Sequence, residues 1–126
     1  MKVKFDIKLN TPNLNGLTHT TEGMAKAVEK YQINIANYRA FGQLGIPENN
    51  ILDLAEVSHK IKSLEIIDDE LCGDVEILKT PKGEILQSLI NELGLENLRF
   101  VPTGTGVVQN KTIINYTITS LDFIPK

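Results

Sequence analysis

The 126-residue chain has one cysteine, two histidines and no tryptophan, and no apolar run reaches the roughly 20 residues of a membrane-spanning helix. The lone Cys72 excludes an internal disulfide and suits a reducing compartment. One cysteine and two scattered histidines do not make a zinc site. Aromatic residues form 6% of the chain and are not interleaved with basic ones, which argues against binding of single-stranded nucleic acid.

The charge and composition predict an ordinary globular domain without cofactor or metal. A net charge of −3 gives no general attraction to nucleic acid or to an anionic membrane. The length predicts one domain, residues 1–126, and the N-terminus lacks the apolar core of a signal peptide. The acidic cluster Asp68-Asp69-Glu70 is too compact for a calcium loop. Gly104-Thr105-Gly106 lacks the strand-to-helix context of a phosphate loop, so we expect a turn between strands there.

The sequence pattern of the first half of the chain predicts a strand and a helix, followed by a loop. Residues 2–9 alternate apolar and polar side chains, as a half-buried strand does. A helix should begin at Thr20 or Thr21, and its buried stripe consists of Met24, Val28, Tyr31, Ile35 and Tyr38. The glycines, proline and asparagines between Phe41 and Asn50 predict a loop.

The sequence pattern of the second half of the chain predicts a hairpin, a second helix and further strands. A phase change near Lys62-Ser63 indicates a β-bulge, and residues 68–70 form the hairpin turn. Thr80-Pro81 is typical of a helix start, and Gly94 of a helix end. From Leu98 the chain is β again, with a turn at residues 109–111. Short turns between strands favour antiparallel pairing over a doubly wound parallel sheet.

Four segments carry a resemblance to a known family, and the fourth matches its motif most specifically. They are Asn15-Gly16-Leu17-Thr18-His19-Thr20, Gly42-Gln43-Leu44-Gly45-Ile46-Pro47, Val57-Ser58-His59-Lys60-Ile61 and Gly73-Asp74-Val75-Glu76-Ile77-Leu78-Lys79-Thr80-Pro81-Lys82-Gly83. From about Asn13 to Pro125 the chain resembles the prohead core proteases of tailed phages, which are relatives in fold of the herpesvirus assemblin. The resemblance implies an α+β fold with a mainly antiparallel sheet, or a partly closed barrel, and two principal helices.

The chain departs from this family where catalysis should occur. Aligning its glycines with the family's S-S-R-G-x-G segment puts Val101 and Pro102 at the two serines, and Ile46 stands where we place the catalytic histidine. Asp122 matches an acidic residue that could be the third member. Proline offers no nucleophile or backbone N–H, and isoleucine cannot carry a proton. We therefore expect no catalytic residues and a chain that is not an enzyme.

A rearranged active site is the alternative. Its base would be His59, oriented by Asp122, with a nucleophile among Ser58, Ser63, Ser88, Thr103 and Ser120. The phase of His59 with its apolar neighbours instead predicts a partly buried histidine with satisfied hydrogen bonds. Thr103 is expected to be a turn residue, and His19 to be exposed and inert.

The resulting hypothesis is a non-catalytic phage structural or head-assembly protein, a pseudoenzyme that binds capsid or scaffold subunits in the virion or in the host cytoplasm. Edge strands such as residues 2–9 or the C-terminal strand would permit a homo-oligomer. The alternatives are an active serine-type prohead protease with a rearranged site, and a phage-encoded binder of a host protein.

Overall fold

The computed structural model describes residues 1–125, which form two sheets and two main helices. The first sheet has the order β1-β5-β4-β3, and all its strands pair antiparallel. The second has the order β2-β7-β6, in which β6 and β7 pair antiparallel and β2 runs parallel to β7. The elements are β1 (Lys2–Lys4), β2 (Thr18–His19), α1 (Thr21–Ala36), β3 (Phe41–Gln43), β4 (Val57–Ile67), β5 (Glu70–Ile77), α2 (Pro81–Leu93), β6 (Leu98–Gln109) and β7 (Thr112–Pro125).

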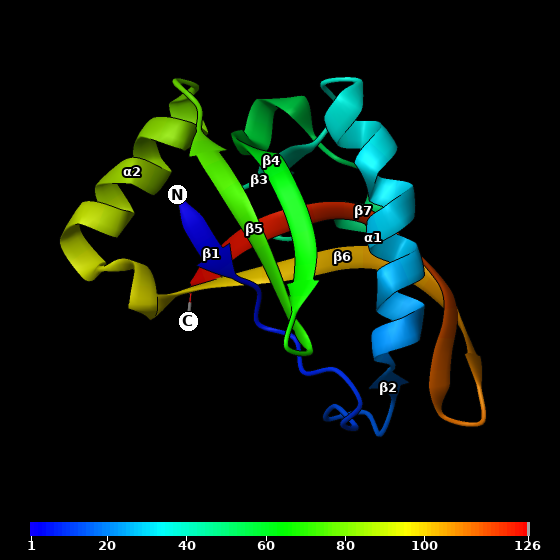
Figure 1. Cartoon of the computed structure of the whole chain (residues 1–126). Coiled ribbons are helices and arrows are strands. Elements are labelled where there is room, and N and C mark those ends of the chain that lie inside the picture. The colour runs from blue at the N-terminus through cyan, green and yellow to red at the C-terminus, as the bar shows by residue number, and fades with distance from the viewer. Residues whose placement is uncertain (126) are drawn as a thin grey trace.

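The strands of the two sheets cross one another, and the helices lie toward opposite ends of the molecule (Figure 1). The core between the layers contains fully buried side chains from both sheets and both helices, among them Met24, Leu71, Leu86, Leu121 and Phe123. The predicted α+β fold with mainly antiparallel sheets and two helices is thus confirmed. The described strands form two separate sheets, so the partly closed barrel is not confirmed.

Both helices begin at the threonines that the sequence indicates. The Thr20 hydroxyl accepts a hydrogen bond from the Gly23 N–H at 2.9 Å, and the Thr80 hydroxyl accepts one from the Gly83 N–H at 3.0 Å. These bonds satisfy donors that the first helical turn leaves free. At the other end of α1 the prediction was wrong for Tyr38, which lies beyond the helix and is 86% exposed.

The β4–β5 hairpin also follows the prediction. Its register shifts between Ile61 and Ser63, where the sequence changes phase. The turn residues Asp68 and Asp69 both have positive φ, 50° and 60°, as tight two-residue hairpin turns require.

The N-terminal strand and the loop after α1 were predicted less well. Only Lys2–Lys4 pairs with β5, because the chain then leaves the first sheet for the second. The Phe5 N–H donates to the Leu71 carbonyl, whereas the next N–H, from Asp6, donates to the Phe100 carbonyl of β6. Within the predicted loop of residues 41–50, β3 adds a short strand to the edge of β4.

Gly104-Thr105-Gly106 is not a turn, and here the prediction was wrong. The segment lies inside β6, which passes through it with register shifts on either side. A Cβ atom on Gly104 would collide with the Thr117 carbonyl and lie 2.8 Å from the Tyr116 ring; one on Gly106 would lie 3.3 Å from that ring. The two glycines therefore let β6 lie close to β7, against the Thr117 carbonyl, the Ile113 side chain and the ring of Tyr116.

Replacing Gly104 with alanine should lower the free energy of unfolding by roughly 1–3 kcal/mol, since the new methyl group must displace backbone or the Tyr116 ring. Urea unfolding followed by circular dichroism measures this change. Thr105→Ala, at the exposed position between the glycines, is the matched control and should change stability by less than about 0.5 kcal/mol. Equal stability of the two variants would contradict the role assigned to Gly104.

Candidate functional site

A cluster of buried polar side chains lies where β3, β4 and β7 meet. Its members are all at most 5% exposed: Gln43, Ser58, His59, Ser120 and Asp122. Buried polar groups destabilise a fold unless they are hydrogen-bonded, so their partners decide what the cluster can do.

Both ring nitrogens of His59 are hydrogen-bonded. Nε2 lies 2.7 Å from the Leu121 carbonyl oxygen, which can only accept, so in the neutral ring this nitrogen carries the proton. Nδ1 lies 2.8 Å from the Ser58 hydroxyl oxygen and accepts a hydrogen bond from that hydroxyl. Burial lowers the pKa of His59 to about 4, against a smaller raising effect of the Leu121 carbonyl. At neutral pH the ring is therefore uncharged and held between two strands.

Asp122 accepts three hydrogen bonds from three different segments. Oδ1 accepts from the Gln43 backbone N–H at 3.0 Å, and Oδ2 from the hydroxyls of Ser120 at 2.7 Å and Thr103 at 3.0 Å. Among residues 1–125 no cation forms an ion pair with it. Burial raises the pKa of this carboxyl, and the three donors oppose that rise.

The hydroxyl of Tyr31, on α1, belongs to the same region. It is buried without a hydrogen-bond partner in the structure. Burial raises the pKa of Tyr31, and the nearby Asp122 charge raises it further. Nothing in the local sequence of Tyr31 or Gln43 indicated either residue as a neighbour of the carboxylate, because both contacts arise from tertiary packing.

The structure brings together some of the predicted nucleophiles and separates others. Ser58 contacts His59, and Ser120 and Thr103 contact Asp122. Ser58 and Ser120 are fully buried, whereas Thr103 is partly exposed. Ser63 lies at the β4 bulge and Ser88 on the exposed side of α2, away from the cluster. Of these hydroxyls, Thr103 thus combines partial exposure with a carboxylate partner.

The two positions assigned to the missing serine and histidine lie near this cluster. Pro102 pairs with Leu121, one residue from Asp122, and the Gly45 N–H next to Ile46 donates to the Phe123 carbonyl. The Ile46 side chain is 59% exposed. Neither side chain can act as a nucleophile or base, as the sequence indicates.

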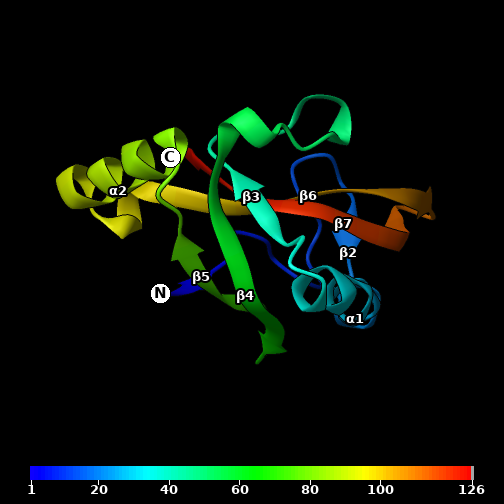
Figure 2. The same ribbon diagram turned by 90° about the horizontal axis from the view of Figure 1, so that it is seen from above.

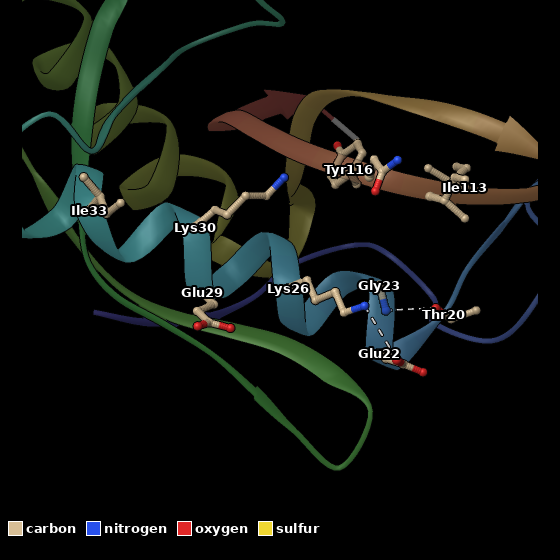
Figure 3. Close-up of a pocket in the computed structure, with 11 residues that line it drawn as sticks. Thr20, Glu22, Gly23, Lys26, Glu29, Lys30, Ile33, Ile113 and Tyr116 are labelled. Atoms are coloured by element: carbon tan, nitrogen blue, oxygen red, sulfur yellow. Dashed lines mark hydrogen bonds and ion pairs between the residues drawn. The ribbon is translucent and has the colours of Figure 1, made fainter.

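The surface of the described chain has several hollows, three of which concern the positions discussed above. One, of about 810 Å³, is a groove between α1 and the outer part of β7 (Figure 3). One of about 760 Å³ lies within the loop that joins β3 to β4 and is lined by Ile46. The third, of about 500 Å³, lies between β6 and the N-terminal segment and is lined by Val101, Pro102 and His19.

His19 differs from its prediction as an exposed, inert residue. It lies in β2 and is half-buried, with its ring 4.7 Å from that of Tyr116 in an edge-to-face arrangement. Burial lowers its pKa. The short strand places it there by pairing with Ile113, which the sequence pattern did not reveal.

The described part of the chain has no group of three or more histidine, cysteine, aspartate or glutamate side chains placed to hold a metal ion. No helix within it is long and apolar enough to span a membrane.

Comparison with known proteins gives a match among solved structures. No family model matches the chain, and no curated protein matches it in sequence. Among solved structures it is similar to the bacteriophage T4 capsid assembly protease, gp21, with a TM-score of 0.77 and 15% sequence identity. The match covers 99% of this chain and 82% of the other. A prohead-protease-like fold is thereby supported.

The expectation that the chain is not an enzyme was wrong, because the structure that it matches along almost its whole length is that of a protease. Pro102 and Ile46 remove a nucleophile and a base at two aligned positions only. The fold also places another hydroxyl, that of Thr103, against a buried carboxylate on the adjacent strand.

Replacing Asp122 with alanine should lower the free energy of unfolding by roughly 2–4 kcal/mol, because the buried Gln43 N–H loses its acceptor and a cavity forms. Asp122→Asn should lose much less stability. Its amide oxygen can still accept the bond from the Gln43 N–H, while its NH₂ donates to the hydroxyls of Ser120 and Thr103. Urea unfolding at pH 7 compares the variants. Similar losses for both would contradict the role given to the acceptor atoms.

Because His59 is buried and neutral, we expect the stability of the fold to depend on pH. Its folded pKa, about 4, lies below the ordinary value of 6.5, so the unfolded chain binds a proton first as the pH falls. The free energy of unfolding should be at its full value above pH 6.5 and should fall as the pH drops toward 4. The loss is on the order of 3 kcal/mol for a pKa shift of this size. His19 shifts in the same direction and adds to the effect.

Urea unfolding between pH 4 and 7.5 measures this slope. His59→Gln, compared with the parent chain at each pH, should have a flatter profile, and His19→Gln serves as a second comparison. An unchanged slope in His59→Gln would show that His59 is not the titrating group.

Proposed function

We propose that this chain acts in phage head assembly, in the host cytoplasm or in the virion, by recognising capsid or scaffold proteins. The observation that carries the proposal is the similarity to a capsid assembly protease along 99% of the chain at a TM-score of 0.77. A fold by itself does not determine a function, so the proposal also needs a surface that can hold a protein segment.

The outer edge of β6 is such a surface. β6 pairs with β7 on one side, and on the other side its described contacts include one bond, from the Asp6 N–H to the Phe100 carbonyl. From Thr103 to Gln109 no described strand covers this edge, and residues 101–110 carry no charge. Uncovered edges of this kind accept an extended segment as an additional strand.

The pocket beside Val101 and Pro102 adjoins this edge. It is lined by the N-terminal segment that lies against β6, and its apolar residues include Ile7, Leu17 and Tyr116. An extended segment that continues along β6 past Asp6 can place an apolar side chain in this pocket. Main-chain pairing then supplies affinity, and the pocket supplies selectivity.

Peptide hydrolysis is a second candidate function, favoured by the contact of Thr103 with Asp122. Burial raises the pKa of Asp122, which makes its carboxylate a stronger base than an ordinary aspartate. In this candidate Asp122 takes the hydroxyl proton as the Thr103 oxygen attacks a peptide carbonyl. The proton passes to the leaving amine, and water then hydrolyses the resulting ester.

Surface plasmon resonance with the purified capsid and scaffold proteins of the encoding phage tests recognition. The parent chain should bind at least one of them. A double variant with lysine at Val107 and Val108, each 54% exposed on β6, should bind about tenfold more weakly, because charges oppose strand addition. Leu93→Lys on α2, 47% exposed, is the control and should bind normally. Binding of neither head protein by the parent chain would refute the proposal.

Mass spectrometry of the same mixtures tests hydrolysis. New fragments that persist with Thr103→Ser and disappear with Thr103→Val support the second candidate, since only serine retains the hydroxyl. Intact proteins after prolonged incubation with the parent chain would contradict it and leave the recognition proposal standing.

A further inference from the structure

The loop from Leu44 to Glu56, here called the acidic loop, exposes an unusual set of apolar side chains. Ile46, Ile51 and Leu54 are 59%, 70% and 73% exposed. All three line the same hollow of about 760 Å³. Single exposed apolar residues are common on protein surfaces, but several around one concave site mark a place of interaction.

The charged residues that line this hollow are all acidic. The acidic loop contains Glu48, Asp53 and Glu56, and the chain has no lysine or arginine between Arg39 and Lys60. Lys82, on α2, pairs with Glu56 at 3.2 Å. Within residues 1–125 no ion pair involves Glu48 or Asp53, so two carboxylates beside the hollow have no counter-charge.

The acidic loop is also held in a defined shape. Its ends meet through the Leu44 N–H and the Glu56 carbonyl at 3.2 Å, and the Asp53 N–H donates to the side-chain oxygen of Gln43 at 3.1 Å. Gln43 is itself bonded to the buried Asp122, and Gly45 to Phe123. The loop forms an arch between β3 and β4 (Figure 2). A surface ordered in advance loses little conformational entropy when a partner binds.

We propose that the acidic loop is the docking site for a segment of a head protein that presents apolar side chains flanked by lysine or arginine. The apolar side chains contact Ile46, Ile51 and Leu54, and the basic ones face Glu48 and Asp53. This inference rests on the proposed role in head assembly and specifies a second contact, separate from the edge of β6. The charge complement decides the chemistry of the partner, because an acidic or neutral segment would leave the two carboxylates unpaired.

The test measures binding of the purified capsid and scaffold proteins to loop variants by surface plasmon resonance. Ile51→Asp should weaken binding at least about tenfold, because it places a charge in the apolar contact. Glu48→Lys should weaken binding and reduce its dependence on salt between 50 and 300 mM, because it removes an attraction that ions screen. Ile33→Asp, on α1 and 64% exposed, is the matched control and should bind as the parent does. Circular dichroism establishes that each variant is folded.

The outcomes separate this inference from the function on which it rests. Normal binding by Ile51→Asp and Glu48→Lys would overturn the docking site and leave the role in head assembly intact. Failure of the parent chain to bind either head protein would overturn both. Sedimentation equilibrium provides the remaining comparison: self-association that Ile51→Asp abolishes would assign the surface to a second copy of the chain and refute a head-protein segment as its partner.

Discussion

The buried carboxylate of Asp122 is the group on which the arrangement of the site depends. Removing a carboxylate from water is strongly unfavourable unless donors replace its hydration. The donors come from β3, β6 and β7 itself, so satisfying one charge fixes three segments relative to one another. The consequence reaches the surface, because Gln43 binds Asp122 through its backbone and the acidic loop through its side chain. A charge in the core thereby sets the shape of an exposed loop.

His59 shows the opposite solution for a buried titratable group. It stays neutral: one ring nitrogen is bonded to Ser58 beside it on β4, and the other joins β4 to the carbonyl of Leu121 on β7. Burial disfavours the charged form of both groups, so it lowers the pKa of His59 and raises that of Asp122. The two sheets are thus connected by polar contacts as well as by the apolar core. Those contacts specify how the sheets meet, which apolar packing specifies less sharply.

Much of the fold could be predicted from the sequence because its signals are local. A threonine three residues before a helix's first glycine, or a change of phase inside a strand, acts through neighbouring residues alone. The early departure of the chain from β1 and the existence of β3 depend instead on partners far along the sequence. Gly104 shows the limit most clearly. Its sequence context suggests a flexible turn, but in the structure a larger residue has no space there, because the Thr117 carbonyl and the Tyr116 ring of β7 lie against it.

The site was harder to predict than the fold because its chemistry depends on which side chains meet across strands. The sequence indicates the missing groups at Ile46 and Pro102 and the buried setting of His59. The contact between Thr103 and Asp122 follows from the register of β6 on β7, which shifts immediately after Thr103. A register one residue different would turn Thr103 to the other face of the sheet and remove its hydroxyl from the carboxylate. The register shift beside Gly104 therefore determines which hydroxyl reaches the buried carboxylate, so the packing of β6 on β7 and the chemistry of the site depend on the same segment.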